Sequence, residues 1–199
     1  MGFSTLIDIL GSTIIGGILF MILLRMNDAA VQNTYNNGGE YIIQQNLVEV
    51  VQLLEYDFRK IGYCKVWSRI PNPSKAIILA DSTSIKFLTD IDNNGYVDTL
   101  HYYLGPSGEL SATPNPNDRL LYRVINSESA IGANLGVTQF RLTYFNSLGN
   151  TINFPIIVPG EIHTMQIDLK VENTSGYNRE YSGAFWRQIR LAARNLMNR

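Results

Sequence analysis

The first 27 residues constrain the fold of this chain more than any other stretch. From Leu6 to Leu24 the sequence is apolar apart from one aspartate, Asp8, and two hydroxyl residues. That length is close to the roughly 20 residues that a helix needs to cross a bilayer. A helix that is apolar on all sides can also be buried in a large protein, but a chain of 199 residues has little room to surround one. We therefore predict that residues 1–27 form a membrane-spanning helix.

A cleaved secretory signal is a weaker interpretation of the same residues. Such a signal begins with a basic region and ends at a small-residue cleavage site. Here nothing basic precedes the apolar run, and no A-x-A pattern follows it. We expect the segment to act as a single-pass anchor.

Asp8 is the unusual residue of this segment. An ionised carboxylate in the apolar part of a membrane helix costs at least about 2.5 kcal/mol, so it normally has a partner. One interpretation places Asp8 at the water interface, close to the chain start. In the other, the chain is trimmed just after Gly2 or Phe3, and the new α-amino group of a neighbouring subunit neutralises Asp8.

Residues 28–62 continue with a polar stretch and then an amphipathic helical pattern. Apolar residues recur there at spacings of three and four, which is typical of a helix face packed on a core; they are Ile43, Leu47, Val50, Val51, Leu54, Phe58 and Ile61. Gly62 is well placed as the C-terminal stop. The pair Gly38-Gly39 lowers helix propensity by about 1 kcal/mol per residue, which predicts a break or a melted turn there.

Residues 63–199 change to the shorter period of β-strands. Runs rich in Ile, Phe, Tyr and Thr are separated by Asn-Gly and Gly-Pro-Ser-Gly turns, which is typical of antiparallel hairpins. We predict strands within 76–110, at 119–125, 137–146, 150–158 and 162–172, and in the tail up to about Leu191. No βαβ alternation occurs, so the predicted class is α+β, with a long N-terminal helix followed by a β-rich globular domain of antiparallel strands.

The charge balance and the cysteine count argue against several functions. The 16 Lys and Arg residues nearly balance 17 Asp and Glu residues, so no basic field is present to hold nucleic acid. The single cysteine, Cys64, rules out an internal disulfide and a multi-thiolate metal site within one chain. No phosphate loop and no nucleophile elbow occurs in the sequence. We expect the chain not to be an enzyme.

The acidic stretch "DIDNNGYVD" follows the spacing of a calcium-binding loop. Oxygen ligands two residues apart can converge on one hard cation where a glycine permits a sharp turn. The candidate ligands are Asp90, Asp92, Asn94, Tyr96 through its backbone carbonyl, and Asp98. The twelfth position is His101 where an EF-hand has glutamate, so full EF-hand chemistry is excluded. The alternative is a plain type I′ hairpin turn at Asn94-Gly95 with aspartates that only solvate it.

The N-terminus resembles a known family. The stretch Gly-Phe-Ser-Thr-Leu-Ile-Asp before an apolar helix is similar to the start of type IV pilins and type II secretion pseudopilins. In that family a prepilin peptidase cuts after the glycine and methylates the new amine, and an acid at the fifth position registers the incoming subunit. The resemblance implies a processing site at Gly2, Phe3 and Ser4, with Asp8 as the register residue. A cut after Gly2 places Asp8 sixth, and a cut after Phe3 places it fifth.

A second resemblance lies at the end of the amphipathic helix. The stretch "LLEYDFRKIGYC", residues 53–64, is similar to the helix end of PilW-like minor pilins and J-type minor pseudopilins. Proteins of these groups often carry a D-x-D-x-x-G-x-x-D hairpin, which favours calcium at the acidic loop. The resemblance implies a pilin-like fold and a structural subunit of a type IV pilus or a type II secretion pseudopilus, at the fibre tip.

Partners and location follow from the same resemblance. It implies other pilin or pseudopilin subunits as partners, together with the membrane and a prepilin peptidase. The implied location is the bacterial inner membrane, with the C-terminal domain exported. The alternative is a single-pass anchored, exported β-domain that binds a ligand and has no role in filaments.

Overall fold

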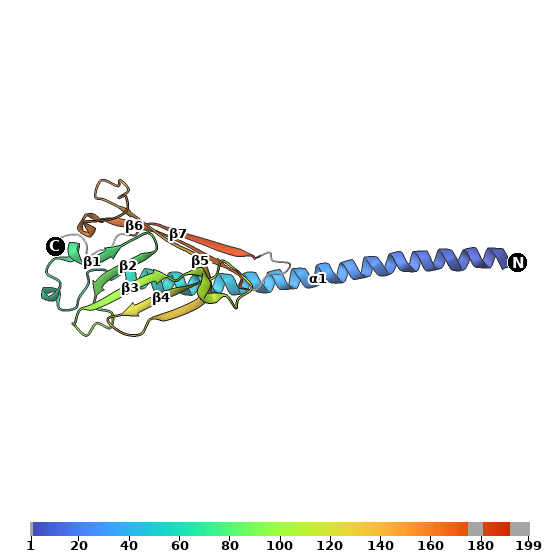
Figure 1. Ribbon diagram of the computed structural model, residues 1–199, viewed down its shortest axis with the longest axis horizontal. Helices are drawn as coiled ribbons and strands as arrows, with labels where there is room; N and C mark the ends of the chain where they lie inside the picture. Colours follow the sequence, from blue (N-terminus) through green and yellow to red (C-terminus); the bar gives the residue numbers. More distant parts are fainter. Residues whose placement is uncertain (1, 175–180, 192–199) are drawn as a thin grey trace. The chain divides into compact units, whose positions relative to one another are not determined.

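One long helix opens the chain. The computed structural model describes residues 2–174 and 181–191, and α1 runs without interruption over Gly2–Arg59 (Figure 1). The predicted break at Gly38-Gly39 is wrong, because both residues are helical. Each glycine costs about 1 kcal/mol of helix propensity, but extending an existing helix is much easier than starting one, and long helical segments flank the pair on both sides. The chain divides into two compact units, Met1–Gly39 and Glu40–Arg199, which are described separately.

The first unit is the apolar part of α1. Its large apolar side chains are exposed, as in Phe3, Leu10 and Phe20, which are 79%, 66% and 61% exposed. The hydroxyls of Ser12 and Thr13 donate to the carbonyl of Ile9, so they add no polar group that needs water. This helix is long and apolar enough, by length and composition, to span a membrane or to act as a signal.

The part of α1 in the second unit, from Glu40 onward, packs on the sheet. The predicted apolar positions form its buried face, at Ile43, Leu47, Val50, Leu54 and Phe58, while Val51 is half-buried. The helix ends at Arg59, and Gly62 follows with φ of +73°. A Cβ at Gly62 would lie 3.3 Å from the Cβ atoms of Ala76 and Pro73, and the Gly62 amide donates to the carbonyl of Leu88 (2.9 Å). The predicted glycine stop is confirmed.

A seven-stranded antiparallel sheet forms the rest of the second unit, with its strands in sequence order. They are β1 (Ile77–Ala80), β2 (Ser84–Thr89), β3 (Asp98–Leu104), β4 (Arg119–Ile125), β5 (Ile131–Phe145), β6 (Thr164–Glu172) and β7 (Gly183–Leu191). Short 3-10 turns lie between them: η1 (Trp67–Arg69), η2 (Pro73–Lys75), η3 (Ser107–Leu110) and η4 (Pro159–Glu161). The α+β class is therefore confirmed.

The predicted strands differ from this sheet at two places. The strand predicted at 137–146 starts too late, because β5 begins at Ile131; the missed stretch contains Gly132 and Gly136, and glycine is depleted in strands. A strand at 119–125 coincides with β4, and the tail strand predicted to end near Leu191 is β7. The predicted strand at 150–158 is wrong, because only Thr151 pairs there, in an isolated bridge to Phe145. Pro155 lies within this stretch, and proline lacks the N–H that a sheet ladder requires. The apolar composition of residues 150–158 was therefore not sufficient to predict a strand.

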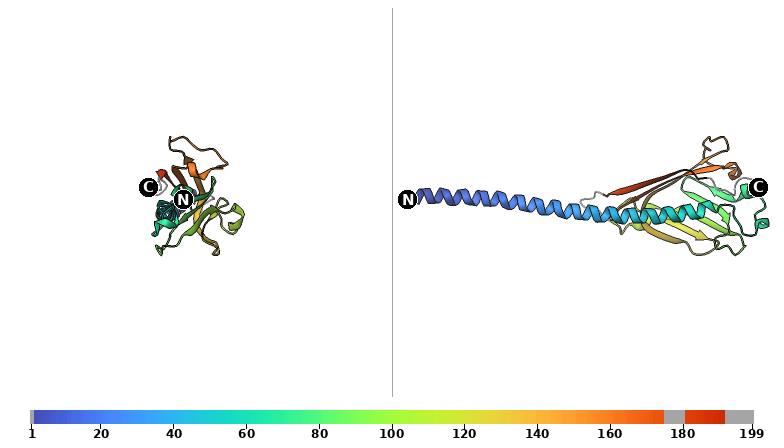
Figure 2. Two further views of the ribbon diagram at one scale, coloured as in Figure 1. Left: turned by 90° about the vertical axis from the view of Figure 1, so that its left-hand side faces the viewer. Right: turned by 180° about the vertical axis from the view of Figure 1, so that it is seen from behind.

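The sheet curls around one side of the helix (Figure 2). Only the first half of β5 pairs with β4, and its second half pairs with β6. Beside that second half lies the β1–β2 turn, where the Leu142 amide donates to the Ser82 carbonyl (2.7 Å) and the Tyr144 hydroxyl donates to the Asp81 carbonyl (3.1 Å). The helix and the concave face of the sheet share one apolar core.

Candidate functional site

The predicted processing and register residues lie in the first turns of α1. Phe3, Ser4 and Asp8 are all exposed, and Asp8 stands between the exposed residues Ile7 and Ile9. None of the ion pairs among the described residues includes Asp8. A carboxylate on an apolar membrane-length helix needs water or a partner, so the geometry leaves Asp8 available to another molecule.

The predicted metal-binding residues form a real cluster at the β2–β3 connection. Asp90, Asp92 and Asp98 each bring one carboxylate oxygen within 4.8 Å of the others. Asp90 is buried, Asp92 is exposed and Asp98 is intermediate. Three carboxylates this close repel one another unless donors or a cation compensate them.

Backbone amides hold one oxygen of Asp90 in place. Its Oδ2 accepts from the amides of Gly95 (2.9 Å) and Lys65 (3.0 Å). Burial raises the pKa of Asp90, but the backbone amides of Lys65, Gly95, Asn94 and Asn93 together outweigh burial and leave the pKa lower than usual. Its other oxygen, Oδ1, is buried and has no hydrogen-bond donor within the described part of the chain. A charged carboxylate with one free buried oxygen suits a cation.

The loop itself is wider than a two-residue hairpin. The register pairs Thr89 with Asp98, so eight residues, 90–97, connect the strands. Asn93 and Gly95 have positive φ, 61° and 88°, whereas Asn94 does not. The type I′ alternative is therefore wrong, because that turn needs positive φ at both Asn94 and Gly95. A Cβ at Gly95 would also lie 2.9 Å from Val66 Cγ2, so a glycine is required there.

The polar side chains of this loop bond mostly to the loop itself. Asp92 Oδ1 accepts from the Asn94 amide (3.1 Å), and Asn94 Oδ1 accepts from the Tyr96 amide (2.7 Å). The Tyr96 ring is 62% exposed and lies 4.0 Å from the guanidinium of Arg69. His101, the twelfth position, lies in β3, where its Nε2 is 2.9 Å from the Ser84 hydroxyl. It therefore does not replace the missing glutamate.

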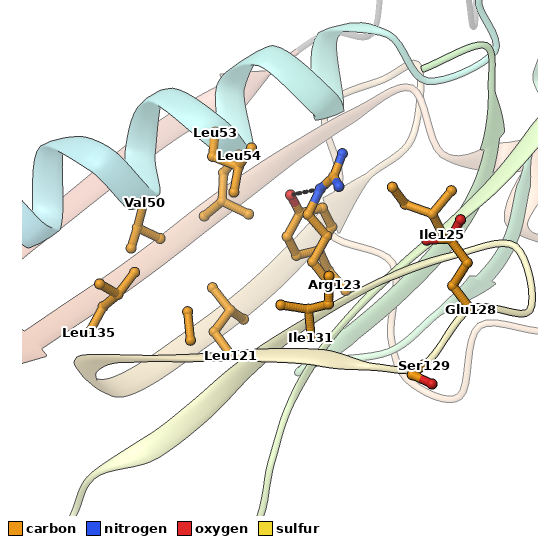
Figure 3. A pocket seen from close by; sticks show the side chains of 12 residues that line it. Val50, Leu53, Leu54, Leu121, Arg123, Ile125, Glu128, Ser129, Ile131 and Leu135 are labelled. Atoms are coloured by element: carbon orange, nitrogen blue, oxygen red, sulfur yellow. Dashed lines mark hydrogen bonds between the residues drawn. The ribbon is translucent and has the colours of Figure 1, made fainter. Parts of the chain in front are cut away.

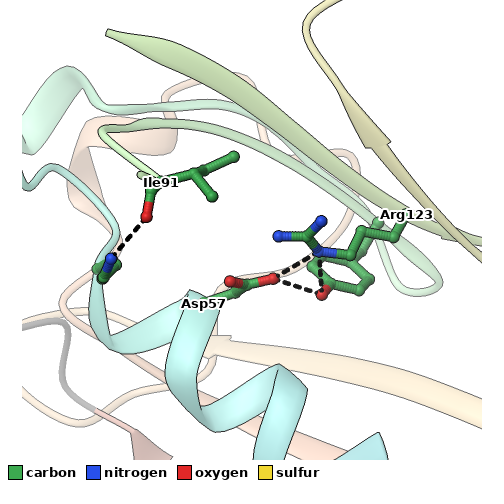
Figure 4. Close-up of polar contacts among 5 residues, drawn as sticks. Asp57, Ile91 and Arg123 are labelled. Atoms are coloured by element: carbon green, nitrogen blue, oxygen red, sulfur yellow. Dashed lines mark hydrogen bonds and ion pairs between the residues drawn. The ribbon is translucent and has the colours of Figure 1, made fainter. Parts of the chain in front are cut away.

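Two residues that the sequence analysis missed support the loop from outside. Asn126, in the β4–β5 turn, donates from Nδ2 to Asp98 Oδ1 (2.9 Å), and it accepts from the Thr99 amide (2.8 Å). Lys60, just past the helix, donates from Nζ to the Ile91 carbonyl (2.8 Å; Figure 4). Asn126 has φ of 52°, but nothing in its sequence context pairs it with Asp98, 28 residues away. The partly buried Asp90, Asp92 and Asp98 cluster can bind a metal, with oxygen donors that suit a hard cation.

A second polar cluster joins α1 to the sheet. Asp57 is buried, and its Oδ2 accepts from the Tyr102 hydroxyl (2.6 Å) and from Arg123 Nε (2.8 Å; Figure 4). Burial and the Asp57 carboxylate raise the pKa of Tyr102, so its hydroxyl stays protonated and donates. Burial lowers the pKa of Arg123, but the hydrogen bonds and charges of Asp57 and Tyr102 outweigh burial and leave the pKa above its usual value. The helical spacing could have predicted that Asp57 is buried, because Asp57 follows the core residue Leu54 by three residues and so lies on the same face of the helix.

No protein-family model, curated protein or solved structure matches this chain. Its classification therefore rests on its own geometry, a long N-terminal apolar helix whose second part packs on an antiparallel sheet. The architecture is pilin-like. A pilin-like fold does not by itself show that the protein functions as a pilin, because one fold can serve several functions.

Proposed function

We propose that this chain is a minor pilin or pseudopilin, a structural and assembly subunit of a type IV pilus or a type II secretion pseudopilus at the fibre tip. The observation that carries the proposal is α1, whose first part is apolar and exposed with Asp8 near its start, and whose second part packs on the sheet. Exposed apolar surface of this extent needs a membrane or other subunits to cover it. In this role the chain acts by assembly and not by catalysis.

The processing step of the proposal involves Gly2, Phe3 and Ser4. A prepilin peptidase would cut after Gly2 or Phe3, in the inner membrane, and expose a new α-amino group. That amine would neutralise Asp8 of a neighbouring subunit, because opposite charges at the same depth in a low-dielectric medium attract strongly. The exposed position of Asp8 supports this pairing between chains.

The deciding experiment reads the N-terminus of the protein isolated from native membranes, by intact mass and peptide sequencing. A chain that begins at Phe3 or Ser4 with a methylated amine supports the assembly role. A retained Met1 or Gly2 contradicts it. Variants Asp8→Leu and Asp8→Glu then separate the two roles, because a filament subunit needs the acid and a simple anchor tolerates leucine.

The acidic loop supplies a structural cation site in this proposal. We assign calcium to Asp90, Asp92 and Asp98, because a buried charged oxygen without a donor favours a hard cation. Asn94 and the Tyr96 carbonyl complete the predicted ligand set. Calcium should raise the thermal unfolding temperature of the wild type, a chelator should reverse the effect, and Asp90→Asn should abolish it. An unchanged unfolding temperature would remove calcium from the proposal.

The second candidate function is an anchored, exported β-domain that binds a ligand and joins no filament. A cavity between α1 and the sheet favours this candidate, because it is lined mainly by apolar groups. The N-terminal measurement separates the two candidates, since an anchor of this kind requires no trimmed and methylated amine.

A further inference from the structure

A cavity of about 180 Å³ lies between the packed part of α1 and the β4–β5 hairpin (Figure 3). Its inner wall is apolar and comes from the helix and from both strands of the hairpin, with Val50, Leu54, Leu121 and Leu135 among its residues. An engineered apolar cavity of about 150 Å³ binds benzene. This cavity therefore has room for one large aliphatic or aromatic side chain.

Exposed apolar residues flank the cavity. Leu53 on the helix is 44% exposed, and Ile131 at the start of β5 is 69% exposed. A small molecule inside the cavity would leave these two side chains in water, whereas a protein surface laid across the opening would bury them. An apolar centre with a polar edge is also the usual anatomy of a protein–protein hot spot.

The polar edge of the cavity carries Arg123, Glu128 and Ser129 (Figure 3). Arg123 uses Nε to bind Asp57, so its charge is already compensated, and no hydrogen bond of its two terminal nitrogens occurs within residues 2–174 and 181–191. In the same part of the chain, no ion pair of Glu128 occurs. The uncompensated charge at the opening is therefore negative, and the free donors belong to Arg123.

We propose that this cavity is a docking site for a segment of a partner subunit that inserts one large apolar side chain. The segment carries a Lys or Arg beside that side chain, which pairs with Glu128, and one of its main-chain carbonyls accepts from Arg123. The inference rests on the proposed assembly role, because it takes the partner to be another subunit of the same structure.

The test places a photocrosslinking residue at the opening of the cavity in the full-length chain, in native membranes. Ser129→p-benzoylphenylalanine puts the crosslinker at the cavity, and Ser127→p-benzoylphenylalanine is the matched control in the same turn, since Ser127 does not line the cavity. The adduct is mapped by peptide sequencing. The expected adduct from position 129 lies on a large apolar residue of another subunit, with Lys or Arg within one helical turn of it. Adducts only to lipid, or equal adducts from position 127, would overturn the proposal.

A cavity-filling variant tests the same site without unfolding the protein. Ala133 lines the cavity, so Ala133→Leu should occupy it from within and lower the crosslinking yield from position 129 at least tenfold. Its thermal unfolding temperature should not fall, and Ala133→Ser serves as a control that leaves the space open. An unchanged yield with Ala133→Leu would overturn the proposal.

Charge reversal tests the predicted partner chemistry. Glu128→Lys should lower the crosslinking yield more than Glu128→Gln, and equal yields would overturn the pairing with a basic residue. The N-terminus is read in the same sample, so the two proposals fail separately. A processed N-terminus without the mapped adduct rejects docking alone, and an unprocessed N-terminus with that adduct rejects the pilin role alone.

Discussion

Asp8 and Asp57 stand on the same helix, and their surroundings are opposite. Asp8 is exposed among exposed apolar side chains, and no partner in the described residues forms an ion pair with it. Asp57 is buried, and it binds both Tyr102 and Arg123 from neighbouring strands. Burial of a charge is tolerated where partners surround it, and it is costly where they do not.

The comparison extends to the apolar residues on either side of these acids. Phe58 is buried and meets the rings of Phe87 and Tyr102 edge-on, at centroid distances of 5.6 and 5.5 Å. Phe20 is 61% exposed. The second part of the helix thus packs on its own chain, whereas the apolar side chains of the first part are exposed.

The largest expected effect comes from a core aromatic residue. Phe58→Ala should lower the free energy of unfolding of the sheet unit by about 3–5 kcal/mol, because it removes a fully buried ring and leaves a cavity. Chemical denaturation followed by fluorescence would measure this loss. Phe20→Ala is the matched control and should leave that free energy unchanged. Equal losses from both variants would contradict the division of the helix.

The next effect concerns insertion of the first part of α1. Asp8→Leu should favour membrane insertion by at most about 2.5–3.5 kcal/mol, the cost of a charged residue at the centre of a membrane helix, because Asp8 lies near the start of the apolar segment. The measurement is the inserted fraction of the helix in an insertion assay. Asp8→Glu keeps the charge and should insert like the wild type. If Asp8→Leu and the wild type insert equally, Asp8 lies at the water interface.

A smaller effect should follow from removing the charge of the buried Asp57. Asp57→Asn should lower the free energy of unfolding by about 1.5–3 kcal/mol, since it removes the charge that Arg123 and the Tyr102 hydroxyl bind. The control is Glu55→Gln, which removes a partly exposed pair with Arg59 at 3.6 Å and should cost less than about 0.5 kcal/mol. If Asp57→Asn also lowers the free energy of unfolding by less than about 0.5 kcal/mol, apolar contacts alone hold the helix on the sheet.

The smallest effect concerns Gly38 within α1. Gly38→Ala should stabilise the local helix by about 1 kcal/mol, because a Cβ there meets no atom within 4 Å. Amide hydrogen exchange around residue 38 should slow accordingly. Gly62→Ala is the contrasting variant and should destabilise the unit, since alanine disfavours φ of +73°. Unchanged exchange at residue 38 would mean that the glycine does not limit helix stability.

Periodicity in the sequence predicted the elements where local pattern and tertiary packing agree. The spacing of Ile43, Leu47, Leu54 and Phe58 predicted the buried helix face. Runs of strand-forming residues predicted the strands from β1 to β7, apart from the first part of β5 at 131–136 and the absent strand at 150–158. The predicted break at Gly38-Gly39 failed because a propensity of single residues does not include the cooperativity of a long helix. The spacing of the acidic loop correctly grouped Asp90, Asp92 and Asp98, because a short loop keeps residues close in sequence close in space.

The sequence by itself determined the apolar helix, its amphipathic continuation, the antiparallel class and the acidic loop, since all of these depend on residues near one another in the chain. Only the tertiary structure decided which distant groups meet. It brought Arg123 and Tyr102 to Asp57, Asn126 to Asp98, and the β4–β5 hairpin to Val50 and Leu54. These contacts depend on the curl of the sheet and on strand register, and no local pattern encodes the packing of side chains that are separated by dozens of residues.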